Sequence, residues 1–288
     1  MRGIYTAGIL ELFMQQQFDP FDLYIGVSAG SCNLSNYIAK DQDKNPWTYR
    51  VPMMQDEFIN LKRFLRGGHL FDIEWLLHEN QRVRPIDVEK ANRNLLSSGK
   101  EFRMVVSNVD TGKPEYLAPT KENWLDCLHA SCAIPFFYKN FCRVDGKHYV
   151  DGGLADPIPV KEAYVRGARI IVVLRTRDVQ QRKRWGSYQF FGRYCFRKNP
   201  ALVSAVNEYP KRYMDAIDFI HHPPAEVKIL QLAPPAALVI RTSTRSMAAL
   251  DRLYAQGLED GLKCIDELEQ LLNDNEGSMP VRLHQESL

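Results

Sequence analysis

The chain has 288 residues, of which 25% are charged and 45% are hydrophobic, and its formal net charge at neutral pH is +2. These values are ordinary for a globular protein and argue against a disordered or a membrane-spanning chain. A net charge so close to zero gives no global attraction to nucleic acid, so we expect no nucleic-acid partner.

The cysteines and histidines follow no metal-binding pattern. The sequence has no H-E-x-x-H motif, and its six cysteines lack C-x-x-C spacing. These cysteines are Cys32, Cys127, Cys132, Cys142, Cys195 and Cys264. We therefore expect no metal, no cofactor, and scattered buried thiols in a reducing compartment. Because a secretory-signal pattern and a long apolar run are both absent, we expect a cytoplasmic protein, with peripheral contact at a membrane left open.

The first hundred residues are expected to be mostly helical. Apolar residues at helix spacing predict a helix over residues 4–13 that stops before Pro20. A short apolar run at residues 23–25 predicts a strand, and a helix is expected over residues 31–39. The region from residue 47 to residue 100 reads as helical and irregular.

Further along the chain, apolar runs rich in β-branched residues predict strands, and amphipathic segments between them predict helices. Helices alternating with buried strands indicate an α/β fold with a mainly parallel central sheet covered by helices on both faces. The strands are expected at residues 102–109, 116–118, 148–150, 170–174 and 227–232, and the helices at residues 156–166 and 248–272.

The stretch from Gly26 to Gly30 is the most informative motif, because a G-x-S-x-G sequence lies between a predicted strand and a predicted helix. In such a turn the serine side chain is exposed at the helix N-terminus, so Ser28 is a candidate nucleophile. Backbone N–H groups there, that of Ala29 among them, can stabilise an oxyanion. A phosphate-binding turn is the alternative, but the chain lacks G-x-G-x-x-G and the lysine of a P-loop.

A second motif, Asp151-Gly152-Gly153, follows a predicted strand far downstream. Asp151 can take the proton of the Ser28 hydroxyl without a histidine if the two side chains lie within about 3 Å of each other. Partial burial would raise the pKa of Asp151 above about 3.9 and make it a better base. Without Ser28 as a partner, a simple turn aspartate would be the preferred interpretation.

These blocks resemble the patatin-like phospholipase family, in the same order and with similar spacing. Beside the two motifs above, Arg2-Gly3 is similar to the end of the family's glycine-rich oxyanion loop, and residues 130–135 are similar to the helix end that precedes its aspartate. The resemblance covers residues 2–176. It implies a patatin-like domain over residues 1–240, followed by a helical extension and polar tail over residues 241–288.

The resemblance also implies a function. It implies hydrolysis of phospholipid or lysophospholipid esters by Ser28 and Asp151, with Arg2, Gly3 and Ala29 binding substrate or oxyanion and with Gly26, Gly30, Gly152 and Gly153 as motif glycines. In the family, the first strand and three loop glycines lie upstream of the position of Arg2, so we expect that strand to be missing here. The alternative is a catalytically silent lipid-binding or regulatory protein that has lost the oxyanion loop.

An α/β-hydrolase triad in the order Ser, Asp, His is formally open, because His221, His222 and His284 follow Asp151. The histidine pair precedes two prolines and reads as a loop, and His284 lies in a polar tail, so a structural role is preferred for all three.

A basic and aromatic segment without acidic residues suits the interface between water and anionic lipid, and a lid or partner-binding loop is an equal alternative. Its residues include Arg182, Lys183, Arg184, Trp185, Phe190, Phe191, Arg193, Arg197 and Lys198.

Overall fold

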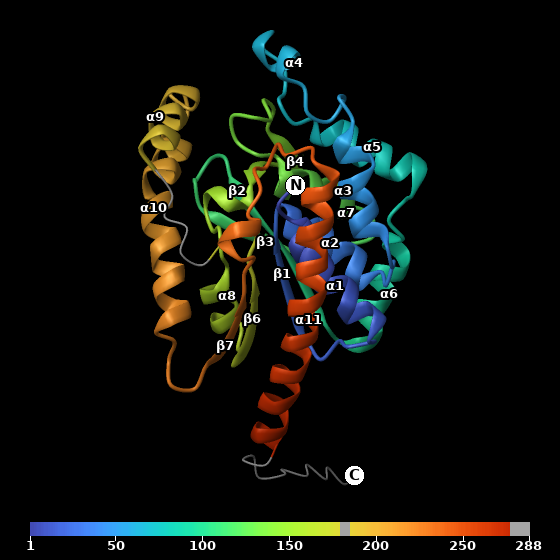
Figure 1. Ribbon diagram of the computed structural model, residues 1–288. Helices are drawn as coiled ribbons and strands as arrows, with labels where there is room; N and C mark the ends of the chain where they lie inside the picture. The colour runs from blue at the N-terminus through green and yellow to red at the C-terminus, as the bar shows by residue number, and fades with distance from the viewer. Residues whose placement is uncertain (179–184, 277–288) are drawn as a thin grey trace.

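The computed structural model describes residues 1–178 and 185–276, and its strands form two sheets (Figure 1). The larger sheet has the order β1-β2-β5-β4, with β3 also paired to β2, and the smaller one pairs β6 with β7. The strands are β1 (Leu23–Val27), β2 (Glu101–Asn108), β3 (Pro114–Leu117), β4 (Cys142–Val144), β5 (Lys147–Asp151), β6 (Ile170–Leu174) and β7 (Lys228–Leu232).

The α/β class is confirmed, and each sheet contains one parallel pair. β1 runs parallel to β2, and β6 runs parallel to β7. β3, β4 and β5 pair antiparallel to their neighbours. The connection from β4 to β5 is a tight turn at Asp145 and Gly146, whose φ angles of 47° and 83° have the sign that two-residue hairpin loops require.

β1 belongs to the larger sheet and β6 to the smaller one, and among the described residues no strand pairs with both of them. Residues of β1 and β6 line the same cavity, which has a volume of about 860 Å³. The candidate catalytic residues Ser28 and Asp151 line this cavity too. The expectation that the family's first strand is missing here stays a prediction.

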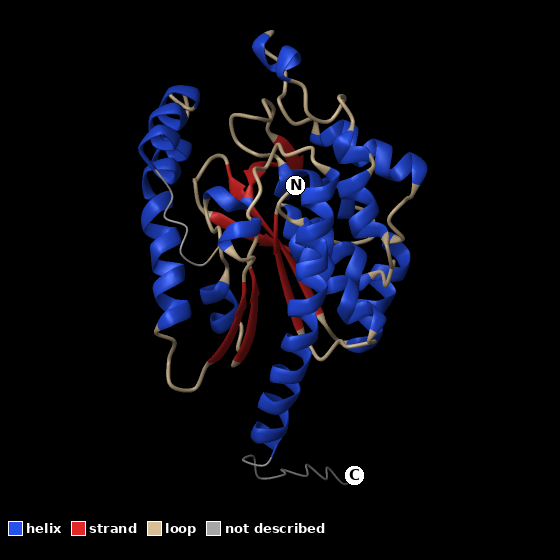
Figure 2. Cartoon of the chain, viewed as in Figure 1, coloured by secondary structure: helices blue, strands red, loops and turns tan. Residues whose placement is uncertain are grey.

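Helices cover the strands on both sides (Figure 2). In Figure 1, α9 and α10 lie on the left of the strands, and α1, α2, α3 and α11 lie on the right. The helices are α1 (Ile4–Gln15), α2 (Ala29–Ile38), α3 (Lys44–Arg50), α4 (Leu61–Leu65), α5 (Ile73–Val83), α6 (Val88–Ser98), α7 (Trp124–Cys132), α8 (Val160–Val165), α9 (Trp185–Cys195), α10 (Pro200–His221) and α11 (Met247–Glu276).

α1 is almost fully buried, because α11 packs along it at very short range. A Cβ atom on Gly257 would lie 2.2 Å from the carbonyl oxygen of Tyr5, and one on Gly8 would lie 2.5 Å from that of Tyr254. The Tyr5 hydroxyl donates a hydrogen bond to Asp260 at 2.7 Å. The glycines thus let two helix backbones meet, which fixes the position of α1 and of the loop before it.

Several predicted elements differ from the structure in their limits. The helix predicted over residues 156–166 is confirmed only over Val160–Val165, because Pro157 and Pro159 cannot supply the N–H groups of a longer helix. His221 is the last residue of α10 rather than part of a loop. The predicted helix over residues 248–272 is confirmed as part of α11.

Candidate active site

Ser28 occupies the turn between β1 and α2 in a backbone conformation that non-glycine residues rarely adopt, with φ of 55° and ψ of −121°. The strain is sustained by tight packing, since a Cβ atom on Gly26 would lie 2.6 Å from the Cα of Ser31. Such a turn points the serine side chain outward at the first turn of the helix. The Ser28 side chain lines the cavity between β1 and β6.

Ser131, near the end of α7, holds this turn in place. Its hydroxyl accepts a hydrogen bond from the Ser28 N–H at 3.1 Å and lies 2.8 Å from the hydroxyl of Ser31. The same hydroxyl donates to the carbonyl oxygen of Val105 in β2 at 2.8 Å. Ser131 therefore links the turn at Ser28 and the first turn of α2 to β2 in the larger sheet.

Asp151 is the last residue of β5, where it pairs with Val106 of β2. Its carboxylate accepts a hydrogen bond from the Gly153 N–H at 2.7 Å, and its carbonyl oxygen accepts one from the Ser107 hydroxyl at 2.8 Å. Gly152 packs directly on β2, because a Cβ atom there would lie 2.2 Å from the carbonyl oxygen of Val105. The D-G-G motif is therefore what lets the aspartate end its strand in close contact with the sheet.

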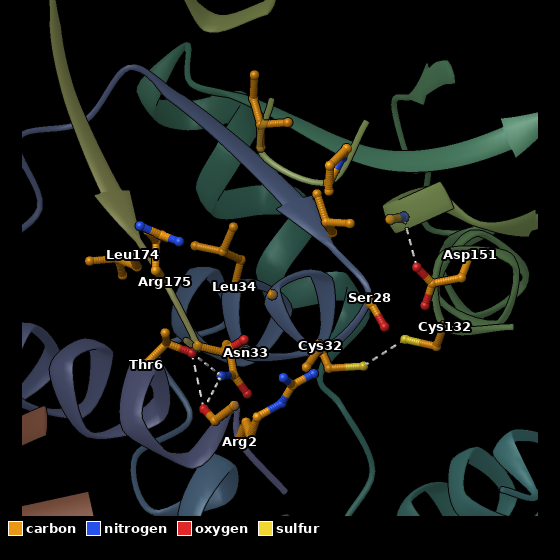
Figure 3. Close-up of a pocket in the computed structure, with 18 of the residues that line it drawn as sticks. Arg2, Thr6, Ser28, Cys32, Asn33, Leu34, Cys132, Asp151, Leu174 and Arg175 are labelled. Atoms are coloured by element: carbon orange, nitrogen blue, oxygen red, sulfur yellow. Dashed lines mark hydrogen bonds between the residues drawn. The ribbon is translucent and has the colours of Figure 1, made fainter. Parts of the chain in front are cut away.

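The environment of Asp151 suits a base that works near neutral pH. The side chain is buried, and this burial raises its pKa from 3.8 to about 6, while hydrogen bonds from Ser28 and from the Gly153 N–H oppose the rise. Figure 3 shows Ser28 and Asp151 on neighbouring elements at the same cavity, with the serine hydroxyl on the side of the carboxylate.

Gly3 and Ala29 lie against each other, since a Cβ atom on Gly3 would lie 3.0 Å from the Cβ of Ala29. Gly3 is the cap residue of α1, and Ala29 is the first residue of α2. The N–H groups of Ile4 and Tyr5 in α1 donate to the carbonyl oxygens of Met1 and Arg2. The N-termini of α1 and α2 therefore meet at Gly3 and Ala29, next to Ser28. Arg2 precedes Gly3 and lines the same cavity.

A buried polar network joins the Arg2-Gly3 loop to α2. Asn33 donates hydrogen bonds to the carbonyl oxygen of Gly3 and to the hydroxyl of Thr6, both at 2.9 Å, and accepts one from the Tyr49 hydroxyl at 3.1 Å. Sequence reasoning missed Asn33, Thr6 and Tyr49, because no local pattern marks them. For Ser131 the signal was present, since it belongs to the motif-like helix end at residues 130–135.

Cys32 and Cys132 meet at the edge of the site, with their sulfur atoms 3.4 Å apart (Figure 3). The hydrogen bond with Cys32 and burial both raise the pKa of the Cys132 thiol. These two thiols are therefore neighbours and not scattered, although all six cysteines are free.

The structure places no described histidine in the lining of the cavity. His222 is exposed and contacts Asp218, and His129 contacts the Tyr138 hydroxyl at 2.9 Å. His284 lies outside the described residues. Within residues 1–178 and 185–276, no group of three or more His, Cys, Asp or Glu side chains could hold a metal ion.

The basic and aromatic segment is described only in part. Arg182, Lys183 and Arg184 lie outside the described residues. In α9, Phe190 is 77% exposed and Phe191 packs one edge on Phe136 with ring centres 5.6 Å apart. Arg193, Arg197 and Lys198 are also exposed. Of the helices described, none has both the length and the apolar composition needed to cross a bilayer.

An α/β fold that presents a serine on a strained turn between a strand and a helix, beside a buried carboxyl group, has the arrangement of a serine hydrolase. A family model of patatin-like phospholipases matches residues 1–164, which is more than half of the chain. The chain belongs to the patatin-like phospholipase family, as the sequence motifs predicted.

Two further comparisons concern proteins of unknown function. A family model described as a domain of unknown function (DUF6363) matches residues 199–273. The uncharacterised protein YjjU of Escherichia coli K12 is 40% identical over 238 residues, a match that covers 82% of this chain and 66% of YjjU. The chain therefore spans just under two thirds of the length of that relative.

Proposed function

We propose that the chain is a serine acyl hydrolase that cleaves carboxylic esters of phospholipids or lysophospholipids with Ser28 as nucleophile and Asp151 as base. The observation that carries this proposal is that a strained serine and a buried carboxyl group with a pKa of about 6 open on one cavity. A base with that pKa is ionised at neutral pH and still accepts a proton readily.

In the proposed mechanism the Ser28 hydroxyl attacks the ester carbonyl while Asp151 takes its proton. The negative charge on the carbonyl oxygen is stabilised by backbone N–H groups of Gly3 and Ala29 at the two helix N-termini. The protonated Asp151 then gives its proton to the leaving alcohol, which leaves an acyl group on Ser28. Asp151 finally takes a proton from a water molecule as the water oxygen attacks the acyl carbonyl. It then gives that proton to the departing Ser28 oxygen, which releases the fatty acid and restores both the Ser28 hydroxyl and the Asp151 carboxylate.

The lipid part of the proposal rests on family membership and on the walls of the cavity. Apolar side chains from both sheets and from α2 line the cavity, among them Leu23, Ile25, Leu34, Val172 and Leu174. A volume of about 860 Å³ lies within the range of small-molecule sites and suits an acyl chain.

Hydrolysis of a chromogenic acyl ester tests the proposal. Ser28→Ala and Asp151→Asn are each expected to lower kcat by at least about 10³-fold, because removing one member of such a unit leaves only binding and oxyanion stabilisation. Ser97→Ala and Asp110→Asn serve as matched controls, since both side chains are exposed on other elements. Wild-type rates in either site variant would reject the assignment.

The alternative is a protein that binds lipid without cleaving it. It predicts that the wild-type chain binds lysophospholipid but turns over no ester, with no difference between wild type and Ser28→Ala. The same ester assay therefore separates the two candidate functions.

We further propose that the protein is cytoplasmic and meets a membrane through α9 and the basic residues around it. The support is the exposure of Phe190 beside Arg193, Arg197 and Lys198, which pairs an aromatic ring with cationic side chains.

A further inference from the structure

Three arginines line the cavity that contains Ser28 and Asp151. Arg2 lies in the loop before α1, while Arg175 and Arg177 follow β6. Figure 3 draws Arg2 and Arg175 around the same cavity as Ser28 and Asp151. The cavity thus combines apolar walls with a cluster of guanidinium groups.

No carboxylate among the described residues forms an ion pair with Arg2, Arg175 or Arg177. Asp151 is the one carboxylate among the described residues that line the cavity. The segment from residue 179 to residue 184, which lies outside the description, contains no acidic residue.

Arg175 is the most telling of the three, because it is only 5% exposed. Its Nη2 donates a hydrogen bond to the hydroxyl of Tyr213 at 2.7 Å. Its Nη1 is buried and has no hydrogen-bond partner among the described residues. A buried cationic donor without a partner is costly, and an anion bound in the cavity would remove that cost.

Arg2 and Arg177 are close enough to repel each other. Burial, and then the charge of Arg177, lower the pKa of Arg2 to about 10, so the group still carries its charge at neutral pH. Tyr209 of α10 lies near both the arginines and the candidate base. Burial raises the pKa of Tyr209 to about 12. The charges of Arg177 and Arg2 oppose this rise, and the charge of Asp151 adds to it. Arg2, Arg177 and Asp151 therefore all lie close enough to Tyr209 for their charges to change its pKa.

The chemistry of the cluster selects the ligand. Guanidinium groups bind phosphate oxygens through paired hydrogen bonds. A choline or ethanolamine headgroup would bring an ammonium group close to three guanidinium groups, which repel it, and Asp151 is the one carboxylate in the described lining. A phosphate group with no attached cation fits this charge pattern.

We propose that Arg2, Arg175 and Arg177 form an anion-binding subsite that makes the protein selective for acyl esters with a net anionic phosphate headgroup. This inference rests on the proposed function for its acyl-ester part. The phosphate binds the three arginines, and the acyl chain occupies the apolar part of the same cavity.

Binding to the Ser28→Ala variant tests the subsite independently of catalysis. Isothermal titration below the critical micelle concentration compares lysophosphatidate with lysophosphatidylcholine of the same acyl chain. We expect at least a tenfold tighter binding of lysophosphatidate. Equal affinities would overturn the anion subsite, whether or not the wild-type chain hydrolyses esters.

Arginine variants in the same background identify the residues responsible. Arg177→Gln, at a half-buried position, and Arg175→Met are each expected to weaken lysophosphatidate binding at least tenfold. They should weaken lysophosphatidylcholine binding less, because its phosphate carries a single negative charge beside an ammonium group, so the preference for lysophosphatidate should shrink. Arg93→Gln, on the exposed face of α6, is the matched control and is expected to change neither. An unchanged preference in Arg177→Gln, with a thermal unfolding curve like that of its parent, would overturn the assignment.

Titration with inorganic phosphate separates a lipid headgroup from a free phosphate. We expect inorganic phosphate to bind at least tenfold more weakly than lysophosphatidate, because it lacks the acyl chain. Phosphate binding as tight as lysophosphatidate binding would overturn the substrate assignment. A lysophosphatidate preference in a protein without esterase activity would instead overturn the proposed function alone.

Discussion

Ser28 combines backbone strain with a side chain that the structure leaves accessible. A non-glycine residue at positive φ costs on the order of 1–3 kcal/mol, so the surrounding contacts must hold it there. The hydrogen bonds of Ser131 and the close packing of Gly26 supply those contacts. These contacts hold Ser28 in a conformation that exposes its hydroxyl group to the cavity.

The first prediction concerns the pH dependence of ester hydrolysis. The carboxylate form of Asp151 is the active base, and its pKa is about 6. We expect kcat/KM to fall about tenfold per pH unit below pH 6 and to level off above it. Rates measured between pH 4.5 and pH 8 in constant ionic strength check this. A profile that stays flat down to pH 4.5 would show that Asp151 is not the titrating base.

The second prediction concerns stability. Because the pKa of Asp151 is raised in the folded state, that state binds more protons than the unfolded state between about pH 4 and pH 6, and stability falls over this range as pH rises. Above pH 6 the buried carboxylate costs on the order of 3 kcal/mol. Asp151→Asn removes this cost, so the variant should be more stable than wild type at pH 8 and equal to it near pH 4. Urea unfolding at both values measures the difference, and a destabilised variant at pH 8 would contradict it.

At the scale of single residues, the sequence predicted the candidate nucleophile and base but missed the residues that hold them in place through hydrogen bonds. Ser28 and Asp151 stand in short motifs whose glycines are readable from spacing alone. Ser131 contacts Ser28 across about a hundred residues of sequence, and Asn33 contacts Gly3 across two elements, so these hydrogen bonds exist only once the chain is folded.

The elements were predictable where local pattern and tertiary environment agree. β1, β2, α1 and α2 match the predicted segments, because their apolar spacing follows the period of the structure they form. α9 and α10 were not predicted as helices. The aromatic and basic residues of α9 suggested an interfacial segment instead. α10 contains Pro210 in its interior, where a sequence-based reading expects a break.

The third prediction concerns the contact between α1 and α11. A methyl group at residue 257 would lie 2.2 Å from the carbonyl oxygen of Tyr5, so Gly257→Ala should lower the free energy of unfolding by roughly 1–3 kcal/mol despite the better helix propensity of alanine. Gly186→Ala in α9 is the matched control, because open space surrounds that position. Denaturant unfolding of both variants measures the change in the free energy of unfolding. If Gly257→Ala were stabilised as much as Gly186→Ala, the close contact between α1 and α11 would be refuted.

For the whole molecule, the sequence predicted the family and the class of fold, while the relation between its parts needed the structure. α11 lies beyond the predicted boundary at residue 240 and packs along α1, the first helix of the chain. The family model of unknown function spans residues 199–273 and so crosses that boundary. The division at residue 240 remains a prediction, and limited proteolysis tests it by cleavage near that position.

The fourth prediction concerns membrane association. Phe190 and the surrounding cations should bring the protein to vesicles that contain phosphatidylglycerol more strongly than to vesicles of phosphatidylcholine alone, in a flotation assay. Phe190→Asp should weaken this binding severalfold. Leu65→Asp is the matched control, because Leu65 is equally exposed, at 76% against 77%, but lies in α4. Equal flotation with both vesicle types would remove the electrostatic part of the proposal.

The most direct test of the account is to locate the residue that reacts with a fluorophosphonate, a reagent that captures activated serine hydroxyls. The labelled protein is digested, and the modified peptide is sequenced by tandem mass spectrometry. The account predicts one adduct, on the oxygen of Ser28, and its loss in Asp151→Asn. An adduct on another serine, or ester hydrolysis that persists in a preparation whose Ser28 is fully modified, would contradict it.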